Sequence, residues 1–245
     1  MTDIVGSRDF LNSLDGEDLP DDIEAFLDIV REKYGIAHIV YHAINVRGLT
    51  EDEPYLRHTY PEDWVARYFD KGYFALDPVI EAGVGGLIPF DWNTLDWSSR
   101  PRRRFLGEAM EHKVGLSGMS VPIRGIGGEH AILSVTSFQN ERDWSLFLGS
   151  YMGDFQRIAG YIHQSIVTHE RDEPERTITP PSPRERAALQ LAAYGLSTNE
   201  IADKLSIKER TVRAFLETAR FKLHALNRTH AVSVAIGHGF ILPPT

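Results

Sequence analysis

The stretch with the clearest chemical potential runs from Tyr60 to Ile80 and reads YPEDWVARYFDKGYFALDPVI. It combines aromatic rings, several acids and an Asp77-Pro78 step that is followed by two aliphatic residues. A carboxylate that faces inward among rings needs a partner, because burying an unpaired charge is costly. Asp77 therefore either caps or turns the chain before Pro78, or presents a hydrogen-bond acceptor to a bound molecule.

A second candidate is the segment KERTVRAFLETARFKL, residues 208–223. As a helix it would turn an apolar face inward: Val212, Phe215, Leu216, Ala219 and Leu223. The outward face is mostly basic: Arg210, Arg213, Ala214, Glu217 and Arg220. A helix fits the DNA major groove, where arginine pairs with guanine and acids accept from cytosine. Lys208 and Lys222, at its ends, suit phosphates.

The charge distribution separates this end from the rest of the chain. Residues 180–245 carry nine Lys/Arg and five Asp/Glu, a net charge of +4, whereas residues 1–179 carry 17 basic and 30 acidic residues, a net charge of −13. A basic end on an acidic body indicates that the end binds a polyanion.

Several other chemistries are excluded. There is no cysteine, which rules out disulfides, thiolate catalysis and cysteine-ligated zinc. His38 and His42 are four apart, but on a predicted strand this is not a helical metal pair. The glycine clusters at 125–128 and 115–118 match neither a dinucleotide loop nor a nucleophile elbow. We expect no catalytic residue, no metal and no cofactor.

The elements that must position these residues differ between the two ends. Apolar spacing predicts helices at 21–35, 61–72, 100–115 and 144–167. Strands are predicted at 38–44, 118–124 and 130–138, the last two joined in a hairpin by a turn containing Gly125, Gly127 and Gly128. Strands with flanking helices indicate an α-β-α sandwich around a central, mostly antiparallel sheet.

After a charged, proline-containing linker the chain reads as helix only. Ser182 with Glu185 and Ser197 with Glu200 form capping-box patterns, and helices are also predicted at 208–222 and 229–237. Two short helices before a basic helix indicate a helix-turn-helix unit. The predicted fold class is α+β/α, with a first domain at 1–168, a linker at 169–181 and an all-α four-helix helix-turn-helix domain at 182–245.

The segment from Ser182 to Phe240 strongly resembles the DNA-binding domain of the LuxR family of transcription factors. The resemblance rests on the PRE start, the GLS-EIA segment, the ERTV entry to the third helix, the late KL and the NRT-AV step. It implies a set of DNA-contacting residues: Lys208, Arg210, Arg213, Glu217, Arg220 and Lys222. Two positions depart from the family, which usually has a small capping residue at Lys208 and often a histidine at Phe215.

The opening stretch resembles the autoinducer-binding domain of the quorum-sensing LuxR regulators. That family reads YPxxWxxxY, then an Asp-Pro step, then a proline-aromatic-x-tryptophan segment, here PFDW at 89–92. The resemblance runs through most of residues 23–167 and includes Gly118. It implies a pocket for an N-acyl-homoserine lactone lined by Tyr60, Trp64, Tyr68, Asp77, Trp92 and Ser134.

The side chains agree with the polar part of such a ligand. The indole N–H of Trp64 can donate to the lactone carbonyl, and Asp77 is a charged acceptor for the amide N–H. Tyr60 and Ser134 would serve the amide carbonyl. Without the ligand, we expect a cavity and a buried carboxylate that lacks a partner.

The apolar acyl tail of such a ligand favours an aromatic and aliphatic lining. The larger side chains would set the size of the pocket that holds this tail. Tyr68 and Trp92 would wall the cavity, and Phe105, Met110 and Met119 would narrow it together with Tyr60. This mildly favours a short, branched or aryl acyl group over a long chain.

Together the two resemblances imply a quorum-sensing transcription factor that binds an acyl-homoserine lactone and, in response, binds palindromic promoter DNA as a homodimer. The helix at 144–167 is the candidate dimer interface because it adjoins the linker. No apolar run is long enough to span a bilayer and the N-terminus lacks a signal pattern, so we expect a cytoplasmic protein with no membrane partner.

Three alternatives compete with this prediction. A phospho-acceptor receiver domain would need a parallel βαβαβ plan, which the pattern does not show. A lactone hydrolase would need a nucleophile, a base and an oxyanion hole, none of which stands out. A regulator whose pocket binds no lactone stays open.

Overall fold

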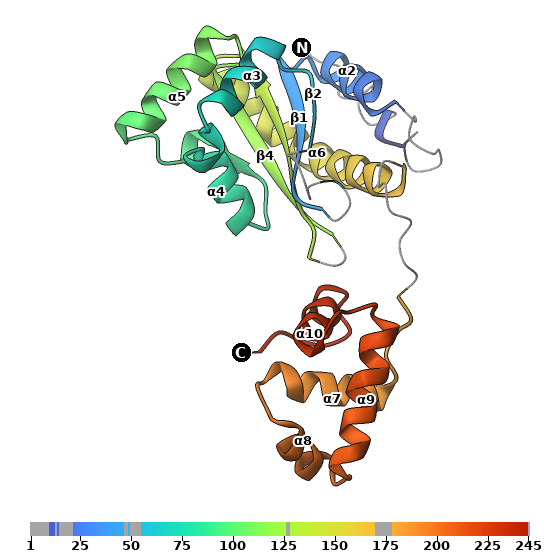
Figure 1. Cartoon of the computed structure of the whole chain (residues 1–245). Helices are drawn as coiled ribbons and strands as arrows, with labels where there is room; N and C mark the ends of the chain where they lie inside the picture. The colour runs from blue at the N-terminus through green and yellow to red at the C-terminus, as the bar shows by residue number, and fades with distance from the viewer. Residues whose placement is uncertain are drawn as a thin grey trace. The chain divides into compact units, whose positions relative to one another are not determined.

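The computed structural model describes residues 10–12, 14, 22–46, 49, 55–125, 128–169 and 178–244. The chain forms two compact units that part between Asp172 and Glu173 (Figure 1). Most of the predicted linker, residues 170–177, lies outside the described residues, as do two of the four residues of the predicted glycine turn, 126 and 127.

The N-terminal unit is built on a five-stranded sheet. Its strands are β1 (His38–Asn45), β2 (Tyr55–His58), β3 (Phe90–Asp91), β4 (Ser117–Arg124) and β5 (His130–Ser137). They lie in the order β2-β1-β5-β4-β3, and every neighbouring pair is antiparallel. The expectation of a mostly antiparallel central sheet with a β4–β5 hairpin is confirmed.

One face of the sheet packs against α2 (Ile23–Tyr34) and α6 (Glu141–His169). Helix α2 begins where the Asp22 carboxylate accepts from the Ala25 N–H, and it ends at Gly35, whose φ of 61° is left-handed. Along α6 a stripe of large side chains is buried, which includes Trp144 and Phe155. This face is the main apolar core of the unit.

The other face carries α3 (Glu62–Asp70), α4 (Pro78–Gly85) and α5 (Arg100–Glu111), with two 3₁₀ turns, η1 (Tyr73–Ala75) and η2 (Trp92–Thr94). Figure 1 shows these three helices on the side of the sheet away from α2. A smaller aromatic cluster of Trp64, Tyr73 and Phe105 holds α3, η1 and α5 together. Helix α4 and the strands β2 and β3 were not predicted.

The C-terminal unit is all helical, with α7 (Pro183–Ala193), α8 (Thr198–Leu205), α9 (Glu209–Lys222) and α10 (Arg228–Gly237). Both predicted capping boxes form, Ser182 with Glu185 and Ser197 with Glu200. Gly195, with φ of 82°, lets the chain turn between the first two helices. The predicted helix-turn-helix arrangement is confirmed.

Candidate functional site

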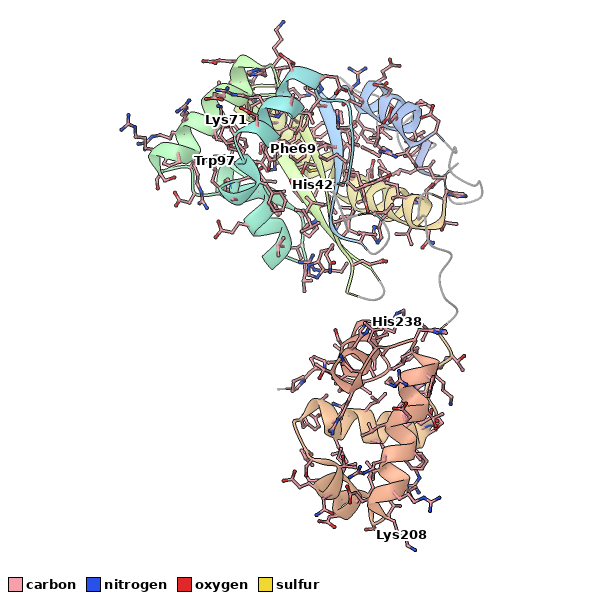
Figure 2. The ribbon with its side chains drawn as sticks, in the orientation of Figure 1. His42, Phe69, Lys71, Trp97, Lys208 and His238 are labelled. Carbon is pink, nitrogen blue, oxygen red and sulfur yellow. The ribbon has the colours of Figure 1, made fainter. Side chains whose placement is uncertain are left out.

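A cavity lies between the second face of the sheet and helices α3, α4 and α5. Its volume is about 90 Å³. All six predicted ligand-binding residues line it: Tyr60, Trp64, Tyr68, Asp77, Trp92 and Ser134. The rest of the lining is mostly aliphatic and aromatic. Figure 2 labels three further lining residues, His42, Phe69 and Trp97.

Asp77 is the buried acid of this cavity, 8% exposed. It is the N-cap of α4: its Oδ1 accepts from the Val79 N–H at 2.8 Å, and Oδ2 accepts from the Tyr68 hydroxyl at 3.0 Å. Burial raises the pKa of the carboxyl to about 6, although both hydrogen bonds oppose that shift. Because two protein groups donate to it, the expectation of an unpaired carboxylate is wrong. Asp77 both caps α4 and faces the cavity.

Tyr60 and Trp64 supply donors near this carboxylate. Burial and the neighbouring charge of Asp77 both raise the pKa of the Tyr60 phenol, so it stays protonated. Trp64 is 3% exposed and its ring stacks on Phe105, with centroids 5.8 Å apart. Within the part of the chain that the structure describes, neither the Tyr60 hydroxyl nor the Trp64 indole N–H forms a hydrogen bond to protein. Both are donors still available to a ligand.

Trp92 and Ser134 are linked through a third residue. The Trp92 indole N–H donates to Ser120 Oγ at 2.8 Å, and Ser120 Oγ lies 2.7 Å from Ser134 Oγ. A Cβ at position 118 would lie 2.5 Å from the Trp92 ring, so Gly118 lets the indole lie flat on β4. Ser134 thus stands at the end of a hydrogen-bond chain that opens on the cavity.

Helix α4 is also held at its C-terminal end. The Arg124 guanidinium, from β4, donates to the backbone carbonyls of Gly83, Val84 and Gly86 at 3.1, 2.6 and 2.8 Å. These are carbonyls that the end of a helix leaves without an internal partner. With Asp77 at the other end, the short helix that closes one side of the cavity is fixed at both termini.

The alternation of the strands decides which residues reach the cavity. Along β1, Ile39 and Tyr41 enter the main core, whereas Val40 and His42 line the cavity. His42 lines the cavity but was not predicted to do so. It lies two residues after Val40 on the same strand, so both side chains face the cavity, and this alternation was the signal that could have identified it. Met119 belongs to the main core on the opposite face and Met110 is 48% exposed, so the expectation that they narrow the pocket is wrong; Phe105 does line it.

The C-terminal unit carries the second candidate site, on α9. Val212, Leu216, Ala219 and Leu223 are buried and Phe215 is partly buried, as predicted. On the outward face Lys208, Arg210, Arg213 and Glu217 are exposed, and Figure 2 shows Lys208 projecting from the start of the helix. Lys208 is the N-cap and makes no side-chain cap bond, which is the expected result of its departure from the family pattern. Arg213 pairs with Glu209 at 2.6 Å.

Two of the predicted DNA-contacting residues are engaged within the fold. The Lys222 ammonium lies 2.8 Å from Oε2 of Glu185, the buried glutamate of the α7 capping box. Burial alone would raise the pKa of Glu185, but Lys222 and the Ser182 N–H hold it below its usual range. Arg220 donates to the Ala225 carbonyl at 2.9 Å and pairs with Glu217 at 2.6 Å. Lys208, Arg210 and Arg213 are therefore the better-exposed basic residues.

Two other kinds of site do not occur in the described ranges. They contain no group of three or more His, Asp or Glu side chains placed to hold a metal ion. They also contain no helix long and apolar enough to cross a membrane.

An aromatic-lined cavity in one unit and a helix-turn-helix with a basic outer face in the other define a ligand-responsive transcription regulator. Residues 20–166 match the family profile "Autoinducer binding domain", and residues 181–235 match "Bacterial regulatory proteins, luxR family". The chain belongs to the LuxR family and is a quorum-sensing transcriptional regulator with an autoinducer-binding and a DNA-binding domain, not an enzyme. The receiver-domain and hydrolase alternatives are thereby excluded.

Several known proteins are similar to this chain in sequence or in fold. The transcriptional activator protein RaiR of Rhizobium etli is 33% identical, over 80% of this chain and 81% of RaiR. The quorum sensing-dependent regulator VjbR of Brucella abortus is 27% identical, over 99% and 96%. Among solved structures, SdiA of Escherichia coli has a TM-score of 0.65 at 21% identity, over 96% and 98%. SdiA has also been solved in complex with octanoyl-rac-glycerol, again at a TM-score of 0.65.

Proposed function

We propose that this regulator binds an N-acyl-homoserine lactone in the N-terminal cavity and, in response, binds palindromic promoter DNA as a homodimer. Residues 1–168 would bind the ligand and dimerise, 169–181 would act as a linker, and 182–245 would bind DNA. The observation that carries the proposal is the convergence of Asp77, Tyr60, Trp64 and Ser134 on one cavity whose other walls are almost entirely apolar.

Each polar group matches one group of the ligand. Asp77 accepts the amide N–H, and Tyr68, which donates to Asp77, orients that carboxylate. Trp64 donates its unused indole N–H to the lactone carbonyl. If Ser120 donates to Ser134, the Ser134 hydroxyl is free to donate to the amide carbonyl beside Tyr60. Trp92 walls the cavity from η2, and the modest volume favours a short, branched or aryl acyl group.

Calorimetry with a panel of acyl-homoserine lactones tests the ligand. Asp77→Asn is expected to weaken binding about tenfold, because an amide keeps the shape but replaces a charged acceptor. Trp64→Phe should weaken it by removing one donor. Asp70→Asn, an exposed acid at the end of α3, is the matched control and should bind like the parent. Parent-like binding by both cavity variants would contradict the pocket assignment.

The panel should include octanoyl-rac-glycerol, because the complex of SdiA with that molecule shows that a protein of this fold accepts an apolar tail on a different polar head. Preference for the acylglycerol over every lactone would replace the lactone assignment while leaving the cavity as the ligand site.

The proposed dimer uses the outer face of α6. Gly149, Gly153 and Gly160 lie on that exposed face, and a Cβ at any of them would meet open space, so a second helix has room to approach closely. Gly153→Arg is expected to convert a dimer to monomers in sedimentation, whereas Gly107→Arg, at an equally open glycine of α5, should not. A monomeric parent would contradict the dimer.

Base reading is assigned to the exposed part of α9. A dimer reads two half-sites about 10 bp apart. On such an operator, Arg213→Ala should reduce discrimination between correct and altered bases by about 1–3 kcal/mol per half-site. Arg184→Ala, an exposed arginine of α7, is the control and should leave that discrimination unchanged. Equal discrimination by Arg213→Ala and the parent would remove Arg213 from the reading set.

A further inference from the structure

His42 is a buried polar side chain in the cavity wall that the lactone assignment does not use. It is 7% exposed and lies on the strand face that carries Val40, so it lines the cavity. Its ring meets the Phe74 ring edge to face at 5.4 Å. Across the described residues, neither imidazole nitrogen hydrogen-bonds to a protein group. An aliphatic residue would fill the same space without burying a polar group that lacks a partner.

The imidazole is neutral in this setting. Burial lowers the pKa of His42 to about 4, and no charged neighbour contributes to that shift. A neutral imidazole carries one N–H donor and one acceptor nitrogen. It therefore suits a hydroxyl, which both donates and accepts, or a carbonyl oxygen, better than it suits a charged group.

The strand register locates His42 relative to the amide-binding groups. On β5, Ser134 is the partner of Val40 and Ile132 is the partner of His42. His42 is thus one two-residue repeat along the sheet from the Ser134 position, about 7 Å. A ligand whose amide lies beside Ser134 and Asp77 would extend its acyl group past His42 at a point several bonds beyond the amide.

We infer that His42 selects an acyl group carrying a hydroxyl or keto oxygen several bonds beyond the amide, and that it binds this oxygen through the imidazole. The inference rests on the proposed function, since it assigns the acyl class of the same ligand. The residues that flank His42 across the sheet, Leu56 and Ile132, also line the cavity; both are aliphatic and offer such an oxygen no hydrogen-bond partner.

The test uses matched lactones on the full-length protein. One pair is phenylpropanoyl- and para-hydroxyphenylpropanoyl-homoserine lactone, and the other is hexanoyl- and omega-hydroxyhexanoyl-homoserine lactone. In calorimetry the parent should bind the hydroxylated member of at least one pair roughly five- to tenfold more tightly, the effect of one net hydrogen bond. His42→Leu should reverse that preference, because the hydroxyl then faces an apolar wall.

His130→Leu, which removes a histidine of the same sheet outside the cavity lining, is the control and should keep the parent's ratio. Equal binding of both members of each pair by the parent, or an unchanged ratio in His42→Leu, would overturn the inference while leaving the proposed function intact. Failure of every lactone to bind the folded parent would instead overturn the proposed function.

A second measurement does not depend on a variant folding. In the parent, the imidazole nitrogen resonances of His42 should shift when a hydroxylated lactone binds and shift much less when its unsubstituted partner binds. The same response to both partners would show that His42 senses occupancy of the cavity and not the oxygen, and would overturn the inference.

Discussion

The two units hold their candidate functional residues in opposite surroundings. In the N-terminal unit these residues line a cavity, where Trp64 is 3% and Asp77 8% exposed. On α9 the outward Lys208, Arg210 and Arg213 are exposed, and their neighbours on the inner face carry the packing. A buried functional group also determines how stable its unit is, whereas an exposed one need not. Substitutions should therefore couple binding to stability in the first unit and separate them in the second.

The largest effect should come from removing a ring from the cavity wall. Trp64→Ala is expected to lower the free energy of unfolding by about 3–5 kcal/mol, because the indole packs on Phe105 and Tyr73 and leaves a cavity when it is lost. Chemical denaturation monitored separately for each unit measures this. Phe138→Ala, at a ring that is 54% exposed, should cost far less. Similar losses for the two variants would contradict the structural role of Trp64.

The pH dependence of Asp77 comes next. Its pKa of about 6 lies above its ordinary 3.8, so the folded state holds the proton more tightly than the unfolded chain. The free energy of unfolding should therefore gain up to about 3 kcal/mol as pH falls from above 6 to below 3.8, and lose it as pH rises. Ligand affinity should change in the opposite direction, because protonation removes the charged acceptor.

Asp77→Asn isolates this contribution from that of the other titrating groups. Unfolding and ligand titrations on either side of pH 6 should show the dependence in the parent and lack it in the variant. If the parent and variant curves run parallel through this range, the carboxyl of Asp77 does not titrate there.

Lys222→Ala tests a predicted DNA-contacting residue that is also paired with a buried residue inside the second unit. Removing the ammonium leaves the buried Glu185 carboxylate without its ion pair, so the unit should lose about 1–3 kcal/mol of stability. Lys204→Ala, at an exposed lysine of α8, is the control. Unchanged stability combined with a shallower salt dependence of DNA binding would instead support the original prediction that Lys222 contacts phosphate.

The smallest effect should also have the opposite sign. Lys208→Ser places a capping hydroxyl at the start of α9, where Lys208 makes no cap bond, and should stabilise the unit by about 1 kcal/mol. The same change removes an exposed charge and should weaken DNA binding. Thermal unfolding and DNA titration of this one variant should show higher stability together with weaker DNA binding. A loss of both stability and DNA binding would contradict the idea that the two are separable on α9.

The sequence predicted the elements whose signals are local and long. The strand HIVYHAI, the 29-residue helix α6 and both capping boxes follow from apolar period and end chemistry. Helix α4 was missed because it has eight residues and contains glycines, although Asp77 followed by Pro78 is also a helix start.

The rest of the site depended on contacts between distant residues. The cavity residues were identified by resemblance, and only the strand register placed His42 beside them and Met119 behind the sheet. Lys222 reads as an exposed helix-end lysine in sequence, and its partner Glu185 is 37 residues away. No periodic pattern along the chain predicts a pairing over that distance.

The contact between Gly118 and Trp92 bears on how this sequence can evolve. A methyl group at position 118 would occupy space 2.5 Å from the indole, so no other residue fits there while a tryptophan occupies position 92. Position 92 must therefore change first: a smaller ring has to replace the tryptophan before position 118 can accept a residue other than glycine. In relatives the two positions should change as a pair, and a chain that has lost the tryptophan should be the one in which the glycine is no longer kept.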